Sequence, residues 1–465
     1  MLPTIATGNV ASAIGGAYEV ANSCRFNKVD NAYHSKSLGT PTDADKFTIS
    51  FWMKLGLVSS TVRTIFNIAV SGGANTFMQL TAADLMVFGI YDSSYLGNLT
   101  TTQVFRDPSA WYHFVCVYDS GNATAGNRMR LYVNGTEVTA FGTDTNPTQD
   151  LDSSNVSGAT FFVGAYGDDD EEFDGYLAEF CFIDGLALTP SSFGEFDSDS
   201  PTIWKPKDPS GLTFGDNGFY LDFEASDNLG NDANGGTDLS ETNLAATDQC
   251  TDIPTNNFPT INPLIKPAAA VPLTEGNLIG TFPGSWTALP ATFGLTAGKW
   301  YFEAKCVTGN GGNFFIGVVT ENQVWGDSSP YNETTGVFLY GPSGRKTVDG
   351  SSSEDFFGDV TSGDIIGVQL DLDSDPKTIL FFLEGTATPD ATPLDLPSTF
   401  DDLSIFPYFI GNSSSATANW EVNFGNPPYA NTSDAADENG YGAFEFAPDS
   451  GYLAICTKNL GSDGG

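Results

Sequence analysis

The feature that most constrains this chain is its near lack of helical periodicity. Apolar and polar residues alternate in short runs, and Gly, Asp, Asn, Ser and Pro bound these runs along the sequence. Alternation with period two is the pattern of a β-strand that buries one face. The 465 residues include 51 Gly and 25 Pro, so turns are frequent. A chain of this length usually has two or three domains, so we predict an all-β protein with more than one domain.

A first block of expected strands extends from residue 21 to residue 199. Asn134-Gly135 marks a tight hairpin turn within it. In the run 175–184, strict alternation predicts that Tyr176, Ala178, Phe180 and Phe182 share one face, and that Leu177, Glu179 and Cys181 share the other. The expected strands include 23–27, 46–55, 64–68, 77–81, 85–91, 111–119, 128–135, 160–166 and 175–184.

This block resembles the laminin-G-like, concanavalin-A-type sandwich. Four stretches carry the resemblance: FTISFWMK (47–54), WYHFVCVYD followed by RLYVNG (111–135), the acidic-loop segment 161–184, and LALTPSSFGEF (186–196). The resemblance implies a jelly-roll of two sheets. It implies no particular ligand, because the same fold carries lectins, enzymes and structural modules.

The composition changes in residues 200–265, which are rich in Pro, Gly and Asn. One strand-like run, NGFYLDFE (217–224), interrupts them. We predict an extended connector with one strand that docks on a neighbouring domain. A fully flexible linker is the alternative, but the apolar run disfavours it.

A second block, residues 266–430, resembles the SPRY-type sandwich. The resemblance rests on GKWYFEAK (298–305), FFIGVVT (314–320), the hairpin GDIIGVQLDLDSDPKTILFFLEG (363–385), and the late pair LSIFPYFIG and NWEVNFG (403–425). One departure is Glu384-Gly385, where the family usually has Asn-Gly. A tail, residues 431–465, contains one more expected strand, GYLAICT (451–457). The predicted fold class is therefore two concanavalin-A-like β-sandwiches in series.

The charge excludes several classes of partner. Lys and Arg total 18 and Asp and Glu total 58, which gives a formal net charge of −40. Nucleic acids and anionic membrane surfaces are therefore unsuitable partners. We expect no membrane insertion, because no window approaches the roughly 18–20 apolar residues of a spanning helix, and the N-terminus lacks the features of a secretory signal. Two His and six Cys without a CxxC pair argue against zinc, and we expect the cysteines to be small buried hydrophobes.

The densest acidic run is a candidate cation site. It comprises Asp168, Asp169, Asp170, Glu171 and Asp174, with Glu172 between the last two. Calcium prefers several carboxylate and carbonyl oxygens, which a loop can supply, so Ca²⁺ is the one cofactor that the sequence suggests. The alternative is a solvated, self-repelling turn, and the sequence favours it over the metal site.

A second candidate site contains two aromatic residues, Trp325 and Tyr331, in a turn-rich segment. Exposed aromatic rings stack on sugars or anchor protein contacts. The alternative is that both rings pack against the edge of the sandwich.

Catalysis is not expected. A retaining glycosidase needs two carboxylates about 5–5.5 Å apart. Relatives of this fold that hydrolyse glycans carry them as E-x-D-x-x-E or a bulged variant, and here Glu172 and Asp174 supply only the first half, because neither Leu177 nor Ala178 is acidic. Two histidines also leave no credible Ser-His-Asp arrangement.

The whole arrangement resembles tail-fibre proteins of marine and cyanobacterial tailed bacteriophages. The phrases NGFYLDF (217–223), DIPTNNFPTINPL (252–264) and GYLAICTKNL (451–460) carry this resemblance. It implies a non-enzymatic virion protein, assembled in the host cytoplasm and commonly trimeric. Residues 1–20 would attach it to other virion proteins, and it would recognise a host surface glycan or protein. The alternatives are a capsid decoration or fibre protein, a free carbohydrate-binding lectin or adhesin, and a polysaccharide depolymerase.

Overall fold

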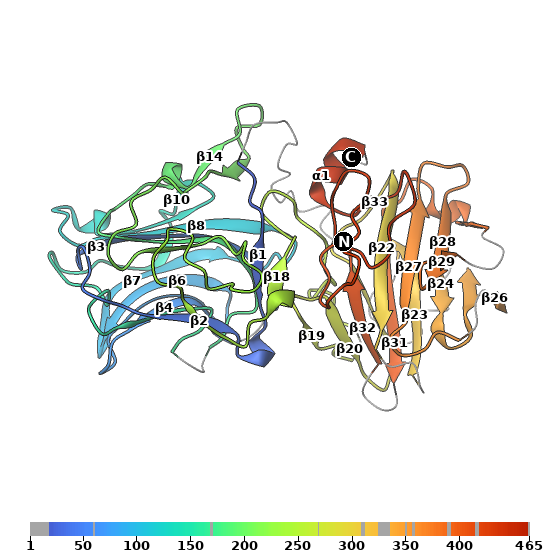
Figure 1. Ribbon diagram of the computed structural model, residues 1–465, viewed down its shortest axis with the longest axis horizontal. Helices are drawn as coiled ribbons and strands as arrows, with labels where there is room; N and C mark the ends of the chain where they lie inside the picture. The colour runs from blue at the N-terminus through green and yellow to red at the C-terminus, as the bar shows by residue number, and fades with distance from the viewer. Residues whose placement is uncertain are drawn as a thin grey trace. The chain divides into compact units, whose positions relative to one another are not determined.

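The computed structural model describes residues 18–58, 61–167, 171–267, 269–307, 312–323, 335–348, 351–355, 359–387, 392–413 and 418–463 (Figure 1). The chain divides into two compact units, and the division falls between Thr255 and Asn256. We call described residues 18–255 the first sandwich and described residues 256–463 the second sandwich. The predicted class is confirmed, since each unit is built from β-sheets, and all but one of the strand pairs among the described residues are antiparallel.

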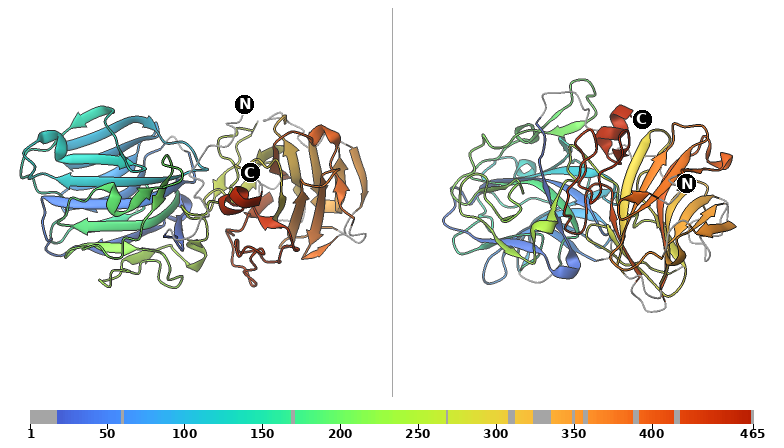
Figure 2. Two further views of the ribbon diagram at one scale, coloured as in Figure 1. Left: turned by 90° about the horizontal axis from the view of Figure 1, so that it is seen from above. Right: turned by 45° about the vertical axis from the view of Figure 1, so that its right-hand side comes forward.

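The first sandwich contains two large sheets and one small one (Figures 1 and 2). Sheet A has the strand order β10-β9-β8-β3-β13-β1-β18, with β16 also paired to β13. Sheet B has the order β11-β7-β6-β5-β4-β12-β2-β17, and β14 pairs with β15. The bounds are β1 (Ser23–Phe26), β2 (Tyr33–Ser37), β3 (Lys46–Leu55), β4 (Arg63–Ala69), β5 (Asn75–Leu80), β6 (Leu85–Asp92), β7 (Ser94–Val104), β8 (Trp111–Asp119), β9 (Met129–Val133), β10 (Thr136–Glu137), β11 (Phe141–Thr145), β12 (Thr160–Val163), β13 (Gly175–Asp184), β14 (Gly194–Phe196), β15 (Trp204–Pro206), β16 (Phe219–Leu221), β17 (Ser240–Thr242) and β18 (Gln249–Cys250).

Alternation along the strands builds the first core. In β3, Phe47, Ile49 and Phe51 face the interior between sheets A and B. The Phe51 ring stacks on Phe114 at 5.6 Å and on Phe180 at 5.5 Å between centroids. Burial of a large apolar side chain contributes about 1.5–3 kcal/mol, so this aromatic layer supplies much of the stability of the sandwich.

The expected connector is instead part of the first sandwich. Strand β3 is buried on both faces. One face lies in the core between sheets A and B, and the opposite face carries Trp52 and Lys54, which another segment of the chain must cover. Residues 186–255 supply that cover, packing side chains such as Trp204 and Tyr220 against sheet A. The segment 200–255 therefore contributes β15, β16, β17 and β18, where the sequence predicted one docking strand in a connector of 200–265. Residues 256–265 belong to the second sandwich.

A β-bulge in β13 overturns the predicted alternation of that strand. The pairing with β3 shifts register between Ala178 and Cys181, and Glu179 takes a left-handed φ of 51°. The extra residue reverses the faces beyond it. Leu177 therefore lies in the core with Phe180, whereas Ala178 packs on the opposite face.

The second sandwich also has two sheets. Sheet C has the order β19-β20-β32-β22-β27-β28-β29, with β30 on β28 and β33 on β22, and sheet D has the order β21-β31-β23-β24-β25-β26. The bounds are β19 (Leu273–Thr274), β20 (Ile279–Phe282), β21 (Thr287–Pro290), β22 (Lys299–Cys306), β23 (Gly312–Thr320), β24 (Gly336–Tyr340), β25 (Arg345–Val348), β26 (Ser351–Asp355), β27 (Ile365–Asp371), β28 (Thr378–Leu383), β29 (Thr386–Ala387), β30 (Leu394–Asp395), β31 (Ile405–Ser413), β32 (Ala418–Asn423) and β33 (Leu453–Ala454), followed by helix α1 (Thr457–Asp463).

The tail is fixed to sheet C through a buried carboxylate. Glu303 accepts hydrogen bonds from the Tyr301 hydroxyl (3.0 Å), the Asn423 amide (3.1 Å) and the backbone N–H groups of Glu445 and Phe446 (3.0 and 2.8 Å). Burial nevertheless raises the pKa of Glu303 to about 7. The predicted tail strand is shorter than expected, because only Leu453–Ala454 pairs with β22 and the chain then turns into α1.

The two ends of the second sandwich are hydrogen-bonded to each other. Asn257 and Thr457 exchange two bonds: the Thr457 hydroxyl accepts from the Asn257 N–H, and the Thr457 N–H donates to the Asn257 carbonyl, both at 2.9 Å. The Lys458 N–H also donates to the Asn256 side chain at 3.2 Å. Two of the phrases that carry the resemblance to phage proteins, 252–264 and 451–460, thus meet in this unit.

All six cysteine side chains are buried, which confirms their predicted role as small core residues. Over the described ranges, no helix combines the length and the apolar character needed to cross a bilayer.

Candidate functional site

Most residues of the two predicted sites lie outside the described residues. This is true of Trp325 and Tyr331, and of Asp168, Asp169 and Asp170. Only Glu171 and Asp174 of the predicted sites are described. The aromatic site therefore stays a prediction.

The two described acidic residues bind their own chain. Asp174 is buried, and its Oδ1 and Oδ2 accept from the backbone N–H groups of Leu57 (3.0 Å) and Lys28 (3.4 Å). Glu171 Oε2 accepts from the Gln79 amide at 2.5 Å. These carboxylates fix neighbouring loops. No group of three or more His, Cys, Asp or Glu suited to a metal occurs among the described residues, so calcium at this loop stays a prediction.

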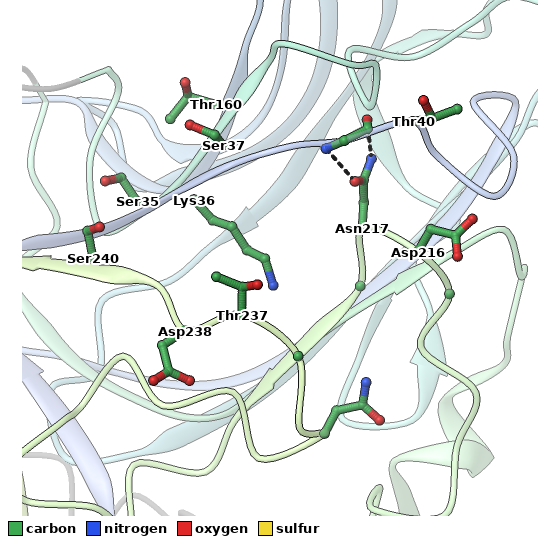
Figure 3. Close-up of a pocket in the computed structure, with 15 residues that line it drawn as sticks. Ser35, Lys36, Ser37, Thr40, Thr160, Asp216, Asn217, Thr237, Asp238 and Ser240 are labelled. Carbon is green, nitrogen blue, oxygen red and sulfur yellow. Dashed lines mark hydrogen bonds between the residues drawn. The ribbon is translucent and has the colours of Figure 1, made fainter.

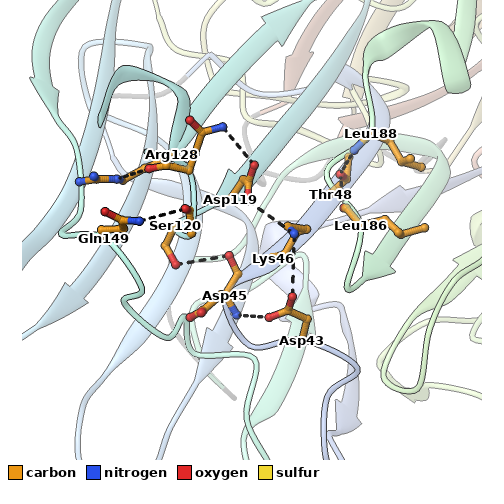
Figure 4. A network of polar contacts seen from close by, with 12 residues as sticks. Asp43, Asp45, Lys46, Thr48, Asp119, Ser120, Arg128, Gln149, Leu186 and Leu188 are labelled. Carbon is orange, nitrogen blue, oxygen red and sulfur yellow. Dashed lines mark hydrogen bonds and ion pairs between the residues drawn. The ribbon is translucent and has the colours of Figure 1, made fainter. Parts of the chain in front are cut away.

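A second acidic cluster, at one end of the first sandwich, is engaged internally (Figure 4). Lys46 Nζ lies 3.7 Å from Asp119 and 4.0 Å from Asp43. Burial and a hydrogen bond shared with Asp152 raise the pKa of Asp45. Lys46 therefore moderates the repulsion between Asp43 and Asp119.

One Ser–His pair is buried in the first sandwich, but its geometry does not make a nucleophile. The Trp204 indole N–H, which can only donate, lies 3.0 Å from His113 Nδ1. The imidazole proton must then sit on Nε2, which donates to Ser50 Oγ at 2.9 Å. His113 thus cannot accept the serine proton through Nε2, and burial lowers its pKa to about 3. The pair holds the segment around β15 on sheet A.

The site with the features of a ligand pocket lies at the edge of sheet B formed by β2 and β17. It has a volume of about 460 Å³, within the range of small-molecule sites, roughly 300–1,000 Å³. Figure 3 shows Ser35 and Ser37 of β2 on one side, Asn217 and Asp216 on the other, and Lys36 between them. The lining residues are Ser35, Lys36, Ser37, Gly39, Thr40, Thr160, Gly215, Asp216, Asn217, Gly218, Asn234, Gly236, Thr237, Asp238 and Ser240.

Internal hydrogen bonds hold the walls of the pocket in place. Asn217 binds the backbone of Gly39 in both directions, accepting from its N–H at 2.7 Å and donating to its carbonyl at 3.1 Å. It also donates to Asn155 at 2.9 Å. Asn217 is buried, so this clamp fixes the loop 215–218 against the segment after β2.

The charges of the pocket favour a neutral ligand. Lys36 is paired with Asp232 at 3.4 Å and lies over the Phe219 ring at 5.3 Å. Asp238 accepts from the Asp232 N–H and from Asn228, and these hydrogen bonds lower its pKa, so it stays ionised. Asp216 is exposed at the rim. The pocket thus offers hydroxyls, amides and carboxylates, and its one lysine is already neutralised.

Sequence reasoning missed this pocket. Its first wall is β2, which the sequence did not predict as a strand. Its second wall consists of residues from 215–218 and 234–238, which the sequence placed in the connector. A signal was present, because YHSKS (33–37) alternates a buried His34 with exposed or half-buried serines. That pattern indicates a strand with a hydroxyl-bearing outer face.

Comparison with known proteins supports the fold of the first sandwich. Residues 29–192 match the family model described as the concanavalin A-like lectin/glucanases superfamily. No curated protein matches the chain. The matched range includes β2 and β12, which form one wall of the pocket, and ends before the loops that form the other.

Solved structures to which this chain is similar include a SPRY domain, a pentraxin and a putative carbohydrate binding protein. The SPRY domain of human HERC1 is 18% identical and covers 35% of this chain and 96% of its own, with a TM-score of 0.27. A heptameric SAP-like pentraxin from Limulus polyphemus is 19% identical over 37% of this chain and 80% of its own, with a TM-score of 0.28. A putative carbohydrate binding protein from Bacteroides ovatus is 16% identical over 48% of this chain and 58% of its own, with a TM-score of 0.32.

Proposed function

We propose that this chain is a non-enzymatic virion structural protein of the tail-fibre type, which binds a carbohydrate of the host surface through the pocket of its first sandwich. The observation that carries the carbohydrate part is the hydroxyl-rich pocket at the edge of a concanavalin A-like sandwich. The virion part is supported by the three phrases that resemble phage tail-fibre proteins.

The ligand class follows from the pocket chemistry. Serine and threonine hydroxyls both donate and accept hydrogen bonds, which matches the hydroxyls of a sugar. Asp216 and Asp238 would repel a carboxylated sugar, and Lys36 is paired with Asp232. We therefore propose a neutral glycan, bound by polar contacts.

Two substitutions in the pocket are expected to weaken glycan binding. Ser37 is exposed on an outer strand position, so Ser37→Trp fills the pocket without entering the core and should abolish binding. Asp216→Ala removes a charged acceptor at the rim and should weaken binding about tenfold, or about 1.4 kcal/mol. Binding is measured first on an array of neutral and acidic oligosaccharides, and then by titration calorimetry with the strongest neutral ligand.

The matched control is Asp227→Ala, which removes an exposed carboxylate of the same unit outside the pocket and should leave the affinity unchanged. Equal affinities for the intact chain and Ser37→Trp would show that the glycan binds elsewhere. Tight binding to acidic oligosaccharides alone would contradict the neutral class.

The place in the particle needs a separate test. We propose that the N-terminal segment attaches the chain to other virion proteins and that the fibre is a trimer. The expected bounds of 1–20 for this segment are too long, because Tyr18 donates to Glu179 and Val20 is buried in the first sandwich. Antibody labelling of purified particles should mark the tail. Labelling of the capsid would indicate a decoration protein, and absence of the chain from particles would leave a free lectin or adhesin. Clearing of host polysaccharide by the purified chain would indicate a depolymerase.

A further inference from the structure

A lysine and an aspartate meet in the interior of the first sandwich, beneath the segment that follows β18. Lys54 Nζ lies 2.5 Å from Asp252 Oδ2, and both side chains have no exposed surface. The Trp111 indole N–H donates to the other carboxylate oxygen, Oδ1, at 3.0 Å. The two partners are 198 residues apart in the sequence.

The surroundings of this pair are apolar and aromatic. Lys54 Nζ lies 5.6 Å from the centre of the Tyr176 ring. Around the pair is a buried cluster formed by Val20, Trp52, Trp111, Tyr176, Ala178, Trp204, Cys250 and Ile253. A medium of this kind disfavours two separated charges and excludes the water that would hydrolyse a reactive intermediate. Burial also lowers the pKa of Lys54, although Asp252 partly opposes the shift.

We propose that Lys54 and Asp252 condense to an intramolecular amide (isopeptide) bond in the folded protein. Proton transfer within the pair gives a neutral amine and a carboxylic acid. Nζ then forms a bond to Cγ of Asp252, and the Cγ–Oδ2 bond breaks. Two of the three Nζ protons leave with Oδ2 as one water molecule, so the ammonium and carboxylate charges disappear together and no co-reactant is required.

Two neighbours have defined roles in this step. The Trp111 N–H points at Oδ1, where negative charge develops when Nζ attacks, so it can stabilise the tetrahedral intermediate. Ser23 Oγ donates to the backbone carbonyl of Asp252 at 2.5 Å, which holds the aspartate against β1. Together they keep Nζ and the carboxyl group in the close geometry that makes an intramolecular reaction fast.

The bond would close a covalent loop from β3 to the last segment of the first sandwich. That loop contains all strands from β4 to β18, which contribute to both large sheets. A crosslink over so long a loop restricts the unfolded chain in the way that a disulfide does. It would also resist a mechanical force applied between β3 and the end of the unit. Unlike a disulfide, it would form without an oxidising compartment.

The test is the intact mass of the purified full chain under denaturing conditions. We expect a mass lower than that of the sequence by one water molecule. Tryptic digestion should show no cleavage after Lys54 and a branched peptide that joins the segments around Lys54 and Asp252. A full sequence mass, with separate unmodified peptides, overturns the proposal.

Matched variants sharpen the test. Asp252→Asn should lose one ammonia molecule and reach the same covalent product and the same final mass as the natural chain. Lys54→Arg keeps the positive charge but should retain its full sequence mass. Trp111→Phe should slow formation about a hundredfold, seen as a larger uncrosslinked fraction soon after synthesis. An Asp252→Asn protein that folds and retains its ammonia would contradict the mechanism.

Discussion

Replacing Asp84 by alanine is expected to destabilise the first sandwich by about 3–5 kcal/mol, because it leaves a buried arginine without its counter-charge. Arg63 has no exposed side-chain surface, and its Nη2 lies 2.5 Å from Asp84 Oδ1. Its Nη1 also donates to the Leu57 carbonyl at 2.7 Å, which holds the guanidinium inside the unit. Arg63 therefore cannot turn to solvent when the carboxylate is lost.

Asp84 has a second arginine partner that provides the control. Arg106 Nε lies 2.6 Å from Asp84 Oδ2, but its side chain is 54% exposed. An exposed ion pair is worth about 0–1 kcal/mol, so Arg106→Ala should have a small effect although it breaks an equally short contact to the same carboxylate. Asp84→Asn tests the charge alone, because asparagine tolerates the left-handed φ of 60° at this turn.

The measurement is hydrogen exchange followed by mass spectrometry. We expect Asp84→Ala to accelerate exchange in β4, β5 and their neighbours in sheet B. Peptides of β22 in the second sandwich provide the internal reference. Equal destabilisation by Arg106→Ala and Asp84→Ala would show that the burial of Arg63 does not determine the loss of stability.

The second large effect is on pH dependence, where the two sandwiches are expected to respond in opposite directions. Both histidines, His34 and His113, lie in the first sandwich, and burial lowers the pKa of each to about 3. The unfolded chain binds these protons below about pH 6.5, whereas the folded unit does not. Their contribution to stability is therefore lost as the pH falls from 6.5 towards 3.

Two buried glutamates act with the opposite sign. Burial raises the pKa of Glu303 in the second sandwich, and of Glu179 in the first, to about 7. In the folded protein each of these glutamates holds its proton more tightly than in the unfolded chain. The resulting stabilisation is fully present below about pH 4.5, the unfolded pKa, and it is lost as the pH rises through about 7. Between pH 4.5 and 6.5, the two histidines outweigh Glu179 by one proton, and the raised pKa of Asp45 reduces this margin. In the second sandwich Glu303 makes the main contribution.

Each proton by which the unfolded and folded states differ changes the free energy of unfolding by about 1.4 kcal/mol per pH unit. From pH 6.5 to 4.5 we therefore expect the second sandwich to gain on the order of 3 kcal/mol, and the first to lose at most about the same amount. Calorimetric scans of the full chain at three pH values in this range should show two transitions that move in opposite directions. Glu303→Gln should flatten the pH response of the second sandwich only. Two transitions that move in parallel would contradict the prediction.

The sequence predicted strands well where alternation is uninterrupted, as in 46–55 and 111–119, because a one-sided apolar pattern has no other stable solution in a sandwich. It failed in β13, because the alternation of apolar and polar residues does not reveal a β-bulge. The register shift near Glu179 reverses the faces of the residues that follow, and only the pairing with β3 shows it. It also failed for 200–255. Alternation tells which residues face the core but not that the opposite face of sheet A, with Trp52 and Lys54, needs cover from a distant segment.

The site was harder to predict than the fold. Clusters of one residue type drew attention to 168–174 and to Trp325 and Tyr331, whereas the pocket is assembled from ordinary Ser, Thr, Asn and Gly residues of separate segments. Residues such as Ser37 and Asn217 are 180 positions apart, and only the pairing of β2 in sheet B and the clamp from Asn217 to Gly39 bring them together. No short motif encodes such a site.

The hydrogen bonds that join Asn256 and Asn257 to Thr457 and Lys458 have a consequence for how such proteins could be recombined in evolution. A cassette that begins at residue 256 carries both partners of these hydrogen bonds with it, so transfer between genes would keep them intact. A break near residue 192, where the matched family range ends, would instead strip the cover from sheet A and yield an insoluble hybrid. We expect exchange between related genomes to respect the boundary at Thr255 and to avoid the one near residue 192.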